Sequence, residues 1–114
     1  MVALMSINFT VDNLVESRRL IITIIVGLLI LIKNEVISID EAEQYLFNPY
    51  SINKLSFCGV DQELLDIVLE GCELENIKRI IPEKYLSTVD DLIIRAINLT
   101  NKYDAPSAPK KWIN

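Results

Sequence analysis

Carboxylates are the side chains in this sequence whose type and spacing could support chemistry. Glu63 and Asp66 lie three residues apart, as do Glu70 and Glu73, and residues at that spacing share one side of an α-helix. Such a pair could share a hard cation or divide the roles of acid and base. Surface carboxylates are common, however, and a divalent cation needs ligands from several elements, so the pattern favours a solvated helix face.

Chemistry built on histidine is excluded, because the 114 residues contain none. Histidine is the commonest general base and the commonest metal ligand in proteins. The two cysteines, Cys58 and Cys72, are too few for a disulfide framework or a four-thiolate zinc site, and they are typical of buried small side chains. Gly27, Gly59 and Gly71 stand too far apart to form a phosphate-binding loop. We therefore expect a protein that is not an enzyme and holds no metal or cofactor.

Negative charge is concentrated in the middle of the chain. The segment from Glu35 to Glu75 holds ten acidic residues and a single base, Lys54, for a net charge of −9. The remaining residues hold six acids and ten bases, and the whole chain carries −5. Nucleic-acid binding needs clustered Lys and Arg, so this distribution argues against it and indicates a basic protein partner.

An unbroken apolar segment runs from Leu20 to Ile32, with Arg18 and Arg19 before it and Lys33 after it. As a helix it would be about 20 Å long, against about 30 Å of membrane hydrocarbon, so we expect a core helix and no membrane span. Its Ile and Val content also permits a strand, but the length and charged ends favour a helix. A helix that is apolar all round is normally covered on all sides. It should therefore be central in a bundle or lie partly in a subunit contact.

Capping signals and apolar periodicity divide the rest of the chain into helices. Ser38–Glu41 has the form of a capping box, and Pro49 should end that helix just before it. Gly59 is typical of a helix C-terminus, while Asp61 and Ser87 are expected to cap the N-termini of two later helices. The expected helices span residues 10 or 12 to 33, 38–47, 51–59, 61–72, 74–81 and 87–103.

These elements predict an all-α fold, a compact bundle of about five helices around the buried apolar first helix. Residues 1–104 should form a single helical domain, with a short strand or extended arm possible at Val2–Phe9. Residues 105–114 are expected to form an extended basic tail. Its Trp112 would either dock on the domain or be offered to a partner.

Four short stretches resemble a family of short, acidic, uncharacterised bacterial proteins. They are Gly27-Leu28-Leu29, Val36 to Glu43, Leu46-Phe47-Asn48-Pro49-Tyr50 and Ile81-Pro82-Glu83. The overall profile is also similar to that of immunity proteins of contact-dependent growth inhibition systems. That resemblance implies a cytoplasmic protein that blocks one cognate toxin, often a nuclease. It assigns no functional residues.

The leading functional hypothesis is an immunity protein whose acidic face covers the basic active-site surface of a toxin, as a monomer or a homodimer. An acidic partner associates quickly with a basic surface through electrostatic steering. Two other hypotheses stay open: a non-catalytic helical adaptor or regulatory subunit, and a carboxylate-dependent, metal-assisted enzyme. The expected contact residues are Asp61, Glu63, Asp66, Glu70 and Glu73, followed by Asp40, Glu41 and Glu43.

Overall fold

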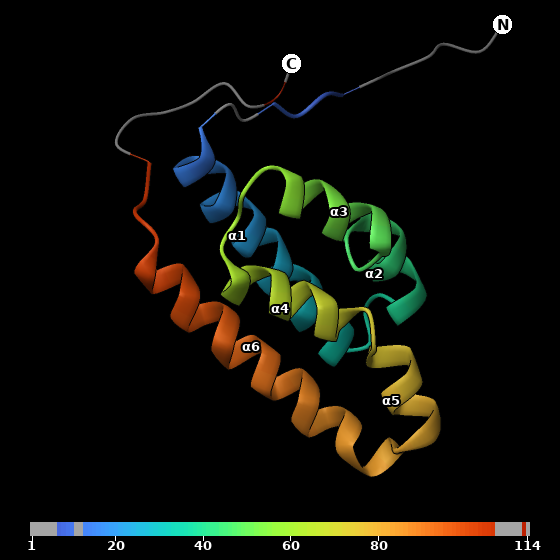
Figure 1. Cartoon of the computed structure of the whole chain (residues 1–114). Helices are drawn as coiled ribbons and strands as arrows, with labels where there is room; N and C mark the ends of the chain where they lie inside the picture. Colours follow the sequence, from blue (N-terminus) through green and yellow to red (C-terminus); the bar gives the residue numbers. More distant parts are fainter. Residues whose placement is uncertain (1–6, 11–12, 107–112, 114) are drawn as a thin grey trace, which may run out of the picture.

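The all-α prediction is confirmed by the computed structural model, which describes residues 7–10, 13–106 and 113. In this part of the chain six α-helices and one 3-10 turn follow one another (Figure 1). They are α1 (Leu14–Lys33), α2 (Ile39–Tyr45), α3 (Pro49–Phe57), α4 (Gln62–Gly71), α5 (Leu74–Ile80), the 3-10 turn η1 (Pro82–Lys84) and α6 (Tyr85–Lys102). Within the described residues, no helix combines the length and apolar content that a bilayer crossing requires.

The two long helices, α1 and α6, pack along each other in opposite directions. Lys33 at the end of α1 forms an ion pair with Asp90 near the start of α6, with 2.6 Å between Nζ and Oδ1. At the other end, Arg19 of α1 donates to the carbonyl of Thr100 in the last turn of α6, at 2.7 Å. Figure 1 shows α4 lying across one side of this pair, with α2 and α3 beyond it.

The hydrophobic core lies between the α1–α6 pair and the shorter helices. Completely buried side chains come from α1, α2, α4, α6 and the first residue of α5, and Phe47 adds one from the turn between α2 and α3. The largest are Phe47, Ile22, Ile25, Leu29, Leu64, Ile67, Leu74, Leu92, Val68 and Val89. Burial of apolar side chains is the main favourable term in folding.

The first helix enters the core along one face, but its opposite face is open in the part of the chain that the structure describes. Ile22, Ile25 and Leu29 are fully buried. Ile24 and Leu31, on the other side of the helix, are 45% and 38% exposed. The apolar sequence had led us to expect a cover on all sides, and the described residues supply it on one side only.

The N-termini of the early helices are set by side-chain caps. The helix expected from Thr10 or Asp12 begins at Leu14, because the Asn13 side chain accepts from the backbone N–H of Val15 at 2.8 Å; Asp12 lies outside the described residues. The Ser38 hydroxyl accepts from the Glu41 N–H at 3.0 Å, as a capping box requires. The Glu41 carboxylate, however, accepts a hydrogen bond from the Tyr45 hydroxyl.

The third and last helices begin earlier than predicted. Asn48 caps α3 and Pro49 occupies its first turn, a position where proline's missing N–H costs nothing. The prediction that Ser87 caps the last helix is wrong. Pro82 ends α5 and forms η1, which continues directly into α6 at Tyr85. Ser87 therefore lies inside the helix, and its hydroxyl donates to the carbonyl of Lys84 at 3.0 Å.

The C-termini of α1 and α3 close with the same pair of backbone hydrogen bonds. In α1 the N–H groups of Glu35 and Val36 donate to the carbonyls of Ile32 and Leu31. In α3 the N–H groups of Gly59 and Val60 donate to the carbonyls of Ser56 and Leu55. This closure needs a residue with positive φ, and Gly59 supplies it with φ 83°. Glu35 adopts φ 58° in the corresponding position, which is unfavourable for a residue with a Cβ.

The ends of the chain are described only in part. Phe9 and Ile113 form an isolated antiparallel bridge. The rest of the expected arm at Val2–Phe9 falls largely outside the described residues, and so do most of the expected basic tail and Trp112.

Candidate functional site

The eight carboxylates predicted to contact a partner fall on two separate parts of the fold. Five belong to α4 and its two ends: Asp61, Glu63, Asp66, Glu70 and Glu73. The other three, Asp40, Glu41 and Glu43, lie on α2. The two groups differ in how far the protein's own basic side chains neutralise them.

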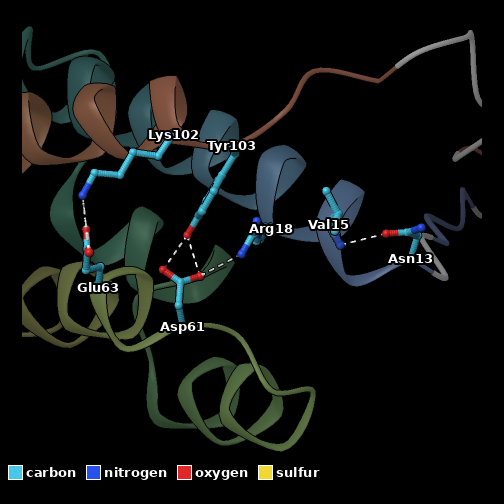
Figure 2. A network of polar contacts seen from close by, with 7 residues as sticks. All are labelled: Asn13, Val15, Arg18, Asp61, Glu63, Lys102 and Tyr103. Carbon is cyan, nitrogen blue, oxygen red and sulfur yellow. Dashed lines mark hydrogen bonds and ion pairs between the residues drawn. The ribbon is translucent and has the colours of Figure 1, made fainter.

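Asp61 is held in a polar network that ties α4 to both long helices (Figure 2). Its two carboxylate oxygens accept hydrogen bonds from the Tyr103 hydroxyl at 2.7 and 2.8 Å. Arg18 of α1 approaches the same carboxylate, with 3.8 Å between Nη1 and Oδ1, and its guanidinium lies 4.3 Å from the centre of the Tyr103 ring. Burial and the bond to Asp61 raise the pKa of Tyr103 well above its usual range.

This network corrects the role expected of Asp61. It stands at the N-cap position of α4, as predicted, but its side chain makes no hydrogen bond to the helix backbone. Arg19, next to Arg18, donates to the carbonyls of Thr100 and Tyr103. These contacts fasten the end of α6 to the start of α1. The Asp61 carboxylate is already engaged by Tyr103 and Arg18, so its first role is to hold the helices together.

Two more acids of α4 are neutralised by basic residues of α6. Glu63 pairs with Lys102 at 3.2 Å, as Figure 2 shows. Glu70 pairs with Arg95 at 2.6 Å, and Arg95 also contacts Asp91 at 3.3 Å. Sequence reasoning missed these pairs because the partners lie far apart in the chain, 39 residues for Glu63 and Lys102. The available signal was the excess of bases outside the acidic segment.

The idea that the acids of α4 share a cation receives no geometric support from their surroundings. The Asp66 carboxylate accepts from the Gln62 amide at 2.8 Å, while the Lys102 ammonium group lies beside Glu63. In the parts of the chain that the structure describes, no group of three or more His, Cys, Asp or Glu residues is placed to hold a metal ion.

The carboxylates of α2 lie in more negative surroundings. Asp40 accepts from the Gln44 amide and Glu41 from the Tyr45 hydroxyl, so both partners are neutral. Burial first, and then the charges of Asp40 and Glu75, raise the pKa of Glu43. Glu43 is therefore close enough to both acids for their charges to disfavour its ionised form.

The acids of α2 continue into those at the start of α5. Burial, followed by the charges of Glu43 and Glu73, raises the pKa of the Cys72 thiol, which places Glu43 near the turn between α4 and α5. We call the combined set Asp40, Glu41, Glu43, Glu73 and Glu75 the acidic surface. Over the described ranges, none of its five carboxylates forms an ion pair with a basic side chain.

A hollow of about 590 Å³ opens beside the acidic surface, between the α1–α2 turn and α5. Glu35, Asp40 and Glu75 line it together with Lys33 and Lys78. Its apolar lining residues are Ile32, Val36, Ile37, Ile39, Pro82 and Leu86. Such a lining can take up the aliphatic stem of a long basic side chain while carboxylates meet its charged end.

Tyr85 and Lys78 complete the wall of this hollow next to α6. The Lys78 ammonium group lies 5.2 Å from the centre of the Tyr85 ring. Burial raises the pKa of Tyr85, and the charges of Glu75 and Glu35 raise it further. The carboxylates of Glu75 and Glu35 are therefore close enough to the Tyr85 hydroxyl to disfavour its ionised form.

A family model described as a protein of unknown function (DUF3969) matches residues 12–114 of this chain. No curated protein and no solved structure matches it. The match spans most of the chain, including all the helices that the structure describes, so the chain belongs to that family.

Proposed function

We propose that this member of the DUF3969 family is a non-catalytic inhibitor that neutralises a cognate basic toxin, of the nuclease kind, in the cytoplasm. The toxin would meet the acidic surface and place a lysine or arginine in the adjoining hollow. The observation that carries the proposal is the concentration of unpaired acids on this surface: within the described residues, none of its five carboxylates forms an ion pair with a basic side chain.

Acids without a basic partner supply a driving force for binding. Burial, followed by the charges of Asp40 and Glu75, already raises the pKa of Glu43 in the isolated protein. A basic side chain placed among them removes the repulsion and adds charge-assisted hydrogen bonds. Nucleases carry positive charge where they bind phosphates, so an acidic partner is suited both to fast association and to exclusion of the nucleic acid.

The internal pairs of α4 shift the expected contact from α4 towards α2 and α5. Glu63, Glu70 and Asp61 already meet Lys102, Arg95 and Arg18. A toxin that bound there would have to compete with these pairs. Asp40, Glu41 and Glu43 are consequently the first contact residues in the proposal, followed by Glu73.

The proposal is tested by the rate of association with the toxin encoded beside the gene, or with a partner captured from the native strain. The double variant D40N/E43Q removes two charges from the acidic surface with little change in shape. The control, E83Q/D104N, removes two charges from exposed positions elsewhere. We expect the first variant to associate at least about tenfold more slowly at low salt and the control to change little, with the difference shrinking as salt rises.

Inhibition of the partner's activity is the second readout. An inhibitor should abolish nuclease activity at stoichiometric concentration. A partner that binds with unchanged activity would instead support a helical adaptor or regulatory subunit. Equal association rates for D40N/E43Q and E83Q/D104N would show that the acidic surface is only solvated.

A further inference from the structure

Helix α1 carries two apolar stripes, and among the described residues only one of them is buried against other helices. The inner stripe of Ile22, Ile25, Leu29 and Ile32 is buried in the core. The outer stripe consists of Leu20, Ile24, Gly27 and Leu31, with steps of four, three and four residues. Alternating steps of three and four residues are what a helix needs to pack against a second helix along its length.

Residues of α6 widen the outer stripe into a continuous face. The ion pair of Lys33 with Asp90 and the contact of Arg19 with Thr100 set the register of the two helices. That register places Ile97 beside the turn of α1 that holds Ile24. We define the outer face as eight residues, of which Leu20 is half-buried and the others are exposed: Leu20, Thr23, Ile24, Gly27, Ile30 and Leu31 of α1, with Ile94 and Ile97 of α6.

We propose that the outer face is the contact between two copies of this chain, which form a symmetric dimer. Ile24, Ile30 and Leu31 of α1 are 38–45% exposed, and Ile94 and Ile97 of α6 are 58% and 44% exposed. The outer face therefore leaves on the order of several hundred Å² of apolar surface open, which approaches the roughly 800 Å² per partner of a standard interface. Exposed apolar faces of that size are often interaction sites.

The absence of charge from the outer stripe favours a second copy over a different protein. A two-fold axis brings the same surface to both sides of the contact, so any charge near the axis would meet its own equivalent. No residue between Leu20 and Ile32 is charged. The basic toxin of the proposed function, in contrast, would find no carboxylate here to recognise.

Gly27 lies at the middle of the outer stripe and lets the two helices approach. A Cβ added to Gly27 would meet no described atom within 4 Å apart from its chain neighbours and the nearby backbone of α1, so its backbone is open to a neighbour. With the two-fold axis at Gly27 and the helices antiparallel, Ile24 of one copy packs against Leu31 of the other. A glycine within a helix lowers the stability of the helix by about 1 kcal/mol relative to alanine. A close helix–helix contact would explain why glycine occupies this position.

The first test is the association state by sedimentation equilibrium, compared among the native chain, I24E and a matched control, L69E. Leu69 is 43% exposed against 45% for Ile24, but it lies on α4, away from the outer face. We expect a dimer for the native chain and for L69E. I24E should raise the dissociation constant at least about 100-fold, because the two-fold axis introduces the charge twice, while its circular dichroism stays helical.

The second test places a thiol at the expected two-fold axis. G27C in a C58S background, which removes the exposed native thiol of Cys58, should form a disulfide-linked dimer under mild oxidation. Thiols near a two-fold axis come within the short range that a disulfide requires, whereas L69C in the same background should stay monomeric on a non-reducing gel.

A native chain that is monomeric at micromolar concentrations would overturn the proposal and leave the outer face to another protein. Equal dissociation constants for I24E and L69E, or equal cross-linking of G27C and L69C, would overturn it as well. The acidic surface is not part of this contact, so D40N/E43Q should dimerise like the native chain, and the dimer and the toxin contact can fail separately.

Discussion

Replacing Tyr103 with phenylalanine tests whether the network around Asp61 fastens the two long helices. The substitution removes one hydroxyl that donates to the Asp61 carboxylate at 2.7 and 2.8 Å and leaves the buried ring in place. A hydrogen bond to a charged group contributes about 1.5–3 kcal/mol. The Asp61 side chain is 34% exposed, so water replaces part of the lost bond, and we expect the free energy of unfolding to fall by about 1–2 kcal/mol.

The assay is urea unfolding followed by circular dichroism, with Y50F as the control because Tyr50 is 77% exposed. Y50F should stay within about 0.5 kcal/mol of the native chain, as surface substitutions do. If Y103F also lowers the free energy of unfolding by less than about 0.5 kcal/mol, the network around Asp61 does not fasten the two long helices.

The same network predicts a dependence on alkaline pH. The pKa of Tyr103 is raised from its ordinary 10.0 in the folded protein. Its contribution is therefore fully present below pH 10 and is lost as the pH rises through the raised folded-state pKa. The stability difference between the native chain and Y103F should be constant below pH 10 and should shrink above it. A difference that grows with pH would show that the sign of the shift is wrong.

Three further substitutions test the packing and the backbone, each by urea unfolding. G71A should lower the free energy of unfolding by about 1–2 kcal/mol, since the new Cβ would lie 2.8 Å from a Phe47 ring atom that has no room to move; an unchanged or raised stability would contradict this. E35G should raise stability by about 1 kcal/mol, because glycine adopts positive φ without strain, and a loss would mean that the Glu35 side chain makes a compensating contact. I25A should cost about 2–5 kcal/mol as a buried aliphatic truncation, whereas I24A should cost less than about 1 kcal/mol in the monomer; similar losses would show that α1 does not present one inner and one outer face.

Most of the helices were predictable, because their apolar periodicity and caps are local signals. Ser38 caps α2 and Gly59 closes α3 as expected. The start of α6 was missed because a proline-initiated 3-10 turn leads straight into it, so the helix needs no serine cap. Local residue preferences cannot distinguish Ser87 as a cap from Ser87 inside the first turn, where its hydroxyl bonds back to Lys84.

The electrostatic character of the candidate site was less predictable than the helices. The count of acids from Glu35 to Glu75 is correct, but a count does not show which carboxylates the fold neutralises. Asp61 meets a tyrosine 42 residues away in the chain, and Glu63 and Glu70 meet bases of α6. Only the three-dimensional structure separates these paired acids from those of the acidic surface. The open side of α1 was hidden for the same reason, since periodicity alone cannot show how many neighbours a helix has.

The pairing of α1 with α6 has a consequence for synthesis on the ribosome. The inner stripe of α1 is made early, but the helix that covers most of it begins at Tyr85, about fifty residues later. At about 5–20 residues per second, the growing chain must carry this apolar helix for roughly 3–10 seconds before α6 emerges. The nascent chain is thus most exposed to aggregation or chaperone capture before its last helix is complete, and the Arg19 contacts that lock the bundle are among the last to form.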